Sequence, residues 1–381
     1  MARTAYVRWA IVAIGLAASP PALAAELSGL LVGATAEERV QDDALFGAGR
    51  DLVTVIAPEI GYAVAGPRLT GSLRYDADLY DYFGDTSQLD VDHHGYLHLN
   101  WLPAPRLKLQ VDGTLQRVTD PLALDRLGVP RLSGESPVVY SAAALELDDR
   151  IAERWTARFG YQMQIAHFEQ PGFIDGSTHV PWAAIERRLS SADDLGLELR
   201  TEIFLRVSDP EAFAETPALD WRHRLAPTLR LELAAGPVAF QAVGAQTAWV
   251  PYAAGGFVWT LQHGEIELRA GRDLVGATGF GVLWADYVEG GWVGRIAGRW
   301  SARLGGTYFL NGLAPDQATA VSGYGVEAAL DFTPARDWRV EAAVDRVDQT
   351  STVAQLEALD LGLDVAALRV VYHWGSDRRL R

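Results

Sequence analysis

The stretch Leu69–Tyr82, LTGSLRYDADLYDY, alternates two kinds of side chain. Every second residue from Leu69 to Leu79 is apolar or small, whereas the positions between them carry polar side chains such as Arg74 and Asp76. Successive side chains of a β-strand point to opposite faces of the sheet, so this period of two predicts a strand with one apolar and one charged face. The stretch is longer than a soluble strand of about five or six residues, and its length suits a tilted strand that crosses a lipid bilayer.

The same alternation recurs along the chain, and no linker separates the segments that show it. It is clear in residues 107–118, 155–165, 195–207, 338–345 and 366–374. At about 20 residues for a strand with its connection, the chain predicts about 18 strands, within roughly 16–20, because single-chain bacterial barrels favour even numbers. We therefore expect an all-β protein with one strand-rich domain.

The connections between these segments alternate in length. Short, turn-like connections occur at residues 103–106 and 189–193, whereas long ones occur at residues 119–137 and 348–361. Barrels of the bacterial outer membrane have short periplasmic turns and longer extracellular loops. The sequence predicts the same asymmetry here.

The charged face of the strands decides how the sheet can be buried. Side chains such as Arg74, Asp76 and Glu198 cannot be packed into a dry core, because an unpaired buried charge is strongly destabilising. The apolar face is in turn too extensive to be left in water. A closed barrel satisfies both faces, with apolar side chains toward lipid, charged side chains around an aqueous lumen, and no unpaired strand edge. The sequence therefore predicts a single transmembrane antiparallel β-barrel in the bacterial outer membrane, with membrane lipid and the barrel insertion machinery as partners.

The alternation assigns eight basic and nine acidic residues to the lumen wall. These predicted lumen-lining residues are Arg74, Asp76, Asp78, Lys108, Asp112, Arg158, Glu198, Arg200, Glu202, Arg206, Glu265, Glu267, Arg269, Arg339, Glu341, Asp345 and Arg369. Since this wall is nearly balanced, the excess acid behind the net charge of −16 is expected mainly in the loops and at the rim. A chain this acidic is not expected to bind nucleic acid, whose phosphates need a basic surface.

Two features test the barrel interpretation. Residues 233–264 contain no Asp, Glu, Lys or Arg, which a pair of membrane helices would also explain. Glycines and prolines such as Gly236, Pro237 and Pro251 break helices, so we expect barrel strands here, with their register the least certain. Tryptophans near strand ends, including Trp101 and Trp182, fit the aromatic girdles that form at membrane interfaces.

The first residues read as an export signal. Arg3 and Arg8 form a positively charged segment before an apolar run over residues 9–18, and Ala22-Leu23-Ala24 matches a signal-peptidase cleavage site. We expect residues 1–24 to be removed and residues 25–381 to form the barrel.

Signals for catalysis or cofactor binding are weak throughout. The chain has no cysteine, a single lysine and no G-x-S-x-G nucleophile motif, so we expect neither an enzyme nor a cofactor. Asp92 and His94 are the weak candidates for metal ligands, because two residues apart on one strand face places them about 6.6 Å from one another. The simpler interpretation is that both belong to a polar lumen wall.

Part of the N-terminal half resembles a known family. The segments 56–62 (IAPEIGY), 66–69 (GPRL), 75–82 and 116–121 (QRVTDP) resemble porin-like barrels associated with exopolysaccharide export, including those of the PEP-CTERM system. The resemblance implies a barrel that acts with a polysaccharide export apparatus. One departure concerns the C-terminus, because barrels usually end on an aromatic residue that the insertion machinery reads, whereas residues 375–381 follow Tyr372 and Trp374 here.

Two functions from different classes follow from these observations. The first is a porin-like barrel with a polar, mixed-charge lumen, serving as a conduit for secreted exopolysaccharide. The alternative is a non-conducting structural or adhesive barrel that acts through acidic extracellular loops. Conductance of the purified protein in planar bilayers separates the two.

Overall fold

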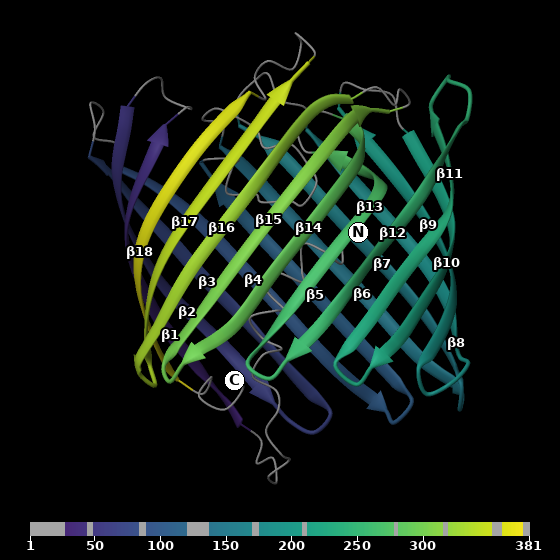
Figure 1. The fold of residues 1–381 in the computed structure, drawn as a ribbon, viewed down its shortest axis with the longest axis horizontal. Helices are drawn as coiled ribbons and strands as arrows, with labels where there is room; N and C mark the ends of the chain where they lie inside the picture. Colours follow the sequence, from purple (N-terminus) through teal and green to yellow (C-terminus); the bar gives the residue numbers. More distant parts are fainter. Residues whose placement is uncertain are drawn as a thin grey trace.

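The chain folds into one closed barrel of eighteen antiparallel strands, as seen in the computed structural model (Figure 1). Each strand pairs with its neighbours in sequence, and β1 pairs with β18 to close the sheet. The structure describes residues 27–43, 49–83, 89–119, 137–169, 175–207, 212–277, 281–314, 319–352 and 360–375. Among these residues, no helix is long and apolar enough to span a membrane. The predicted all-β barrel of about 18 strands is confirmed.

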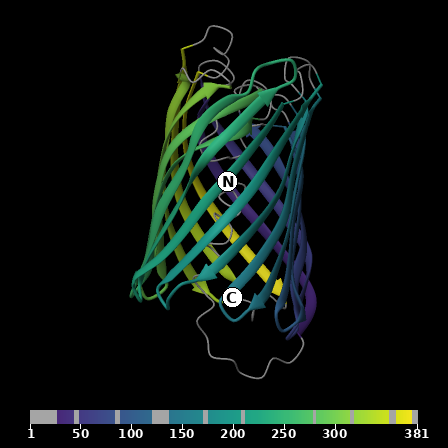
Figure 2. The same cartoon turned by 90° about the vertical axis from the view of Figure 1, so that its right-hand side faces the viewer.

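The strands are 12 to 17 residues long, and they tilt across the barrel wall (Figure 2). Their bounds are β1 Leu27–Asp43, β2 Gly49–Ala65, β3 Leu69–Phe83, β4 Leu89–Ala104, β5 Leu107–Val118, β6 Val138–Ala152, β7 Trp155–Phe168, β8 Gly176–Arg188, β9 Asp193–Arg206, β10 Ala212–Ala226, β11 Leu229–Ala242, β12 Ala248–Leu261, β13 Gly264–Ala277, β14 Gly281–Ala297, β15 Trp300–Leu313, β16 Thr319–Ala335, β17 Trp338–Ser351 and β18 Leu361–Gly375. The predicted signal peptide and most of the connection 119–137 lie outside the described residues.

Connections at the two ends of the barrel differ in length. At one end they span two to four residues, as at 105–106 between β4 and β5, and at the other they span three to nineteen. Gly298 lies in the two-residue turn after β14 with a φ of +51°, a conformation that side chains other than glycine adopt at a cost. This asymmetry is the one expected for short periplasmic turns and longer extracellular loops.

The outward face of the strands is apolar. On β3, Leu73 is 60% exposed, whereas Arg74 and Asp76 on the opposite face are partly buried. At the short-turn end, the outward face carries a row of exposed tryptophans: Trp101, Trp155, Trp259, Trp300, Trp338 and Trp374. A closed antiparallel barrel with an apolar outer surface and an interfacial aromatic girdle is the architecture of the bacterial outer membrane, which is where this chain belongs.

Two regions bear on the sequence predictions for the wall. The uncharged region forms β11 and β12, paired through Val238↔Val250, so the strand interpretation of residues 233–264 is confirmed. A side chain at Gly236 would collide with the backbone of Pro217 on β10, which explains a glycine in this strand. Trp182 departs from the girdle prediction, because it lies on the inward face of β8 and is 9% exposed.

The assignment of the two faces can be tested on β9. Leu199 is 54% exposed near the middle of the strand, so Leu199→Arg should lower the free energy of unfolding by about 2–4 kcal/mol by placing a charge in lipid. Glu198→Arg should cost far less, because this position faces the lumen between the small residues Ala184 and Ala218. Urea titration of protein folded into lipid vesicles, followed by heat-modifiable gel mobility, measures both. Equal losses would contradict the assignment.

Candidate functional site: a narrowed lumen

The structure places every predicted lumen residue on the face opposite the exposed apolar side chains. The residues are Arg74, Asp76 and Asp78 on β3, Lys108 and Asp112 on β5, Arg158 on β7, Glu198, Arg200, Glu202 and Arg206 on β9, Glu265, Glu267 and Arg269 on β13, Arg339, Glu341 and Asp345 on β17, and Arg369 on β18. Several of these residues meet partners that the sequence alone did not assign to them. Their role in transport stays a prediction.

The strand register adds further charged residues to this face, and most of them are acidic. The added acids include Glu37, Glu59, Asp92, Glu146, Asp148, Glu186, Asp220, Glu232, Asp273, Glu289, Glu327 and Asp331. The added bases include Arg39, Arg222, Arg230 and Arg303. The lumen wall is therefore more acidic than the sequence-based set indicated, since alternation was recognised only in the segments of strongest contrast.

Arginines gather these acids into clusters. Arg158 contacts Glu146, donates to Asp148 Oδ1 at 3.2 Å, and donates to Glu186 Oε1 at 2.6 Å. Its guanidinium carbon lies 5.5 Å from the ring centre of Trp182. The inward tryptophan thus packs against a charged cluster, which explains why it does not join the membrane girdle.

A second cluster lies where the barrel closes. Arg369 on β18 contacts Glu37 on β1 and donates to Glu341 Oε1 on β17 at 2.7 Å. Arg303 also donates to Glu341, at 3.1 Å, and Glu341 is 1% exposed. Ion pairs across three adjacent strands stabilise the seam between the first and last strands.

β13 separates from β12 near the loop end, whereas β14 stays paired with β15 as far as Leu283↔Leu313. The last pair between β12 and β13 is Ala253↔Arg272, whereas β13 and β14 remain paired as far as Ala277↔Gly281. Beyond Arg272, β13 is therefore no longer paired with β12, and this end of the hairpin is joined to the wall through the pairing of β14 with β15.

Contacts with β9 show that this end of the hairpin extends into the lumen. Arg200 Nη2 donates to Asp273 Oδ1 at 2.6 Å, although β9 and β13 are four strand spacings apart, or about 19 Å along the wall. Arg200 also lies 2.9 Å from Glu202 Oε1 and over the ring of Tyr252. Arg200 and Asp273 are 6% and 1% exposed, so the ion pair is buried.

Apolar side chains fill the space around the bent hairpin. Leu274 and Trp284 of the hairpin pack in one cluster with Phe204, Phe240 and Val250, from the inward faces of β9, β11 and β12. The rings of Phe240 and Trp284 meet edge to face, with their centres 6.4 Å apart.

A second apolar cluster joins strands on opposite sides of the barrel. Its members are Val118, Val138, Ala166 and Phe168 of β5–β7, together with Tyr287, Phe309, Ala320 and Val321 of β14–β16. Because β5 and β14 are half the circumference apart, these contacts narrow the loop end of the lumen. No sequence pattern indicated this narrowing.

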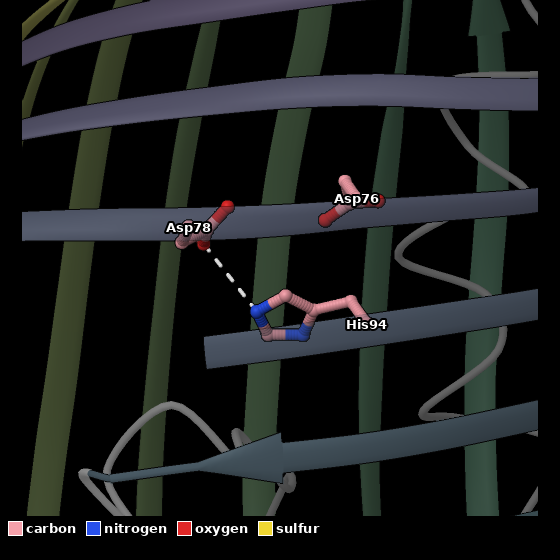
Figure 3. A group of neighbouring side chains, drawn as sticks. All are labelled: Asp76, Asp78 and His94. Atoms are coloured by element: carbon pink, nitrogen blue, oxygen red, sulfur yellow. Dashed lines mark ion pairs between the residues drawn. The ribbon is translucent and has the colours of Figure 1, made fainter. Parts of the chain in front are cut away.

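The weak metal-ligand candidates occupy two different environments. Asp92 Oδ1 accepts hydrogen bonds from the backbone N–H and the hydroxyl of Thr119, at 2.7 and 3.0 Å. His94 instead lies beside Asp76 and Asp78 of β3 (Figure 3). The sequence interpretation therefore identified the histidine but not its neighbours, which come from the adjacent strand.

Comparisons with known proteins give similarity to solved barrel structures only, at low sequence identity. No family model matches the sequence. No curated protein matches it. The barrel is similar to the crystal structure of OccAB4 from Acinetobacter baumannii, with 9% identity, a TM-score of 0.49, and coverage of 91% of this chain and 98% of that one. It is also similar to OpdQ from Pseudomonas aeruginosa, with 10% identity, a TM-score of 0.46, and coverage of 91% and 99%. The outer membrane protein OpdK from the same species gives 10% identity, a TM-score of 0.48, and coverage of 91% and 98%. At this level, the similarities carry no argument about function.

The buried ion pair predicts a large effect of Arg200→Gln on stability. The change leaves Asp273 and Glu202 buried without their cation, so the free energy of unfolding should fall by about 3–5 kcal/mol. Arg230→Gln is the matched control, because Arg230 contacts Glu232 at 2.9 Å but its side chain is 56% exposed, and it should cost about 1 kcal/mol or less. Urea unfolding in vesicles compares the two, and similar losses would show that the hairpin pair contributes no more than a solvated one.

Proposed function

We propose that this protein is a porin-like barrel of the outer membrane whose passage is limited by the inward-bent hairpin of β13 and β14. The pair of Arg200 with Asp273 carries the proposal, because it fixes the hairpin against a distant part of the wall. The apolar clusters at the loop end then narrow the mouth of the lumen.

The wall charges support passage of cations over anions. Acids outnumber bases on the inward face once the strand register is included, in addition to the acid expected in the loops. A negatively charged passage raises the local concentration of cations over about one Debye length, which is ~10 Å at 0.1 M salt. The preference is therefore weak at high salt and stronger at low salt.

A conduit for secreted exopolysaccharide is the more specific form of the proposal. It rests on the resemblance of residues 56–121 to export-associated barrels and on the polar lumen, whose carboxylates and guanidinium groups can hydrogen-bond to sugar hydroxyls. Passage of a polysaccharide requires the hairpin to move from the position seen here. An export apparatus in the periplasm is the partner that this proposal implies.

Planar-bilayer recordings test the proposal. The wild-type protein should give discrete conductance steps. In a salt gradient, its reversal potential should show a preference for cations, and this preference should disappear as the salt concentration rises. Asp273→Asn weakens the pair with Arg200, so it should loosen the contact between the hairpin and β9 and raise the conductance. A strict preference for anions would contradict the role of the wall charges.

A disulfide provides the control for the hairpin. A side chain at Gly276 would touch the Thr178 hydroxyl on β8, so cysteines at these two positions can form a disulfide. The chain has no native cysteine that would compete. In the Asp273→Asn background, the oxidised Thr178→Cys/Gly276→Cys protein should conduct like wild type, and reduction should restore the higher conductance. No conductance in any of these proteins would instead favour the structural or adhesive barrel.

A further inference from the structure

Three donor side chains of metal-binding type converge on the lumen wall. The register of β3 and β4 pairs Asp76 with His94, and the next inward pair along the ladder brings Asp78 to the other side of the imidazole. One donor atom from each of Asp76, Asp78 and His94 lies within 4.8 Å of the other two (Figure 3). The three residues belong to two adjacent strands, so their separation is fixed by the sheet itself.

The imidazole of His94 is buried without a hydrogen bond. His94 is 8% exposed, and neither ring nitrogen has a hydrogen-bond partner among the described residues. Buried polar groups without partners are uncommon in folded proteins, because each one has lost its bonds to water. Apart from an ion-pair contact with Asp78, the buried ring therefore lacks a polar partner among the described residues, which points to a ligand that satisfies it.

The separation of one donor pair is compatible with metal coordination. His94 Nε2 lies 3.4 Å from Asp78 Oδ2, which is longer than a normal N–H···O bond. Two ligand atoms bound to the same tetrahedral Zn²⁺, each at about 2.0–2.1 Å, are roughly 3.3–3.4 Å apart. The ion pair of His94 with Asp78 therefore has a separation that a shared ion would accept, and the donor atom of Asp76 lies within 4.8 Å of both.

The charges around the three donors suit a divalent cation. Two carboxylates and a neutral imidazole carry a charge of −2, which a divalent cation neutralises. Arg74 Nε lies 3.6 Å from Asp76 Oδ1, so an arginine borders the carboxylates and offsets part of their charge. Tyr80 donates to Asp78 at 3.3 Å and orients that carboxylate, as outer hydrogen bonds do at metal sites.

We propose that Asp76, Asp78 and His94 bind a divalent cation of the zinc class on the lumen wall. A mixed nitrogen and oxygen set favours Zn²⁺ and similar transition metals over Ca²⁺ or Mg²⁺, which prefer oxygen ligands. Three protein ligands leave a coordination position for water or for a carboxylate or hydroxyl group of a solute. The site stands independently of whether the barrel conducts.

His98 on the same strand provides a matched control. Its Nδ1 lies 2.6 Å from Asp112 Oδ1, and its Nε2 lies 2.6 Å from the side-chain amide of Asn100. Both ring nitrogens are therefore already satisfied, and this histidine has no place in the proposed site although it also faces the lumen.

Metal binding to untagged, refolded barrel in detergent tests the proposal. After treatment with a chelator, calorimetric titration with Zn²⁺ should show one saturable site per chain, and Co²⁺ should give visible absorption bands that Zn²⁺ abolishes. His94→Gln and Asp78→Asn should each weaken Zn²⁺ binding by about tenfold or more. His98→Gln should bind as wild type does.

Two outcomes would overturn the site. One is the absence of saturable Zn²⁺ binding and of Co²⁺ bands in the wild-type protein, a measurement that needs no variant to fold. The other is an equal loss of affinity in His98→Gln and His94→Gln when heat-modifiable mobility shows both barrels folded. Because neither readout depends on conductance, failure of the metal site and failure of the pore are distinguishable.

Discussion

Backbone hydrogen bonding in lipid is the constraint on which the rest of the structure depends. No water is present in the hydrocarbon layer to satisfy an unpaired strand edge, so the sheet must close on itself. Pairing of β1 with β18, from Leu31↔Gly375 to Asp42↔Asp364, achieves this closure. Arg369 strengthens the seam by binding Glu37 on one side and Glu341 on the other. With the sheet closed, alternate side chains must face either lipid or lumen, and the rest of the wall chemistry follows from that division.

The bend of β13 shows where this constraint relaxes. Beyond Arg272, the loop-end part of β12 has no pairing with β13 among the described residues. That part of β12 adjoins the connection 243–247, where water rather than lipid can satisfy the backbone groups. The backbone hydrogen bonds lost between β12 and β13 are offset by the buried ion pair of Arg200 with Asp273 and by the apolar packing of Leu274 and Trp284. A strand can thus give up pairing with its neighbour and make contacts inside the lumen only near the mouth of the barrel, where water reaches the unpaired backbone groups.

Sequence patterns predicted which face of the wall a residue occupies, but they missed the contacts between residues that are far apart in the sequence. Alternation in β3 predicted which face Arg74 and Asp76 occupy, because inward and outward positions are set within a single strand. The partner of Arg200 could not be predicted, since Asp273 lies 73 residues away and is reached only through the bend. Trp182 was misplaced for a related reason, because aromatic residues near strand ends occur on both faces and only the register separates them. His94 was found as a donor, but its neighbours on β3 depend on how two strands are staggered.

The surplus of carboxylates links the electrostatics of the lumen to the proposed metal site. Arginines such as Arg158 and Arg369 each bind two or more acids, so they hold side chains in place but neutralise only part of the negative charge around them. The field along the lumen then comes from the acids in excess. A negative potential of this origin concentrates divalent cations more strongly than monovalent ones, because the interaction energy scales with charge. A cation held between Asp76, Asp78 and His94 would remove part of the same field, so occupancy of the site and the preference of the lumen for cations oppose one another.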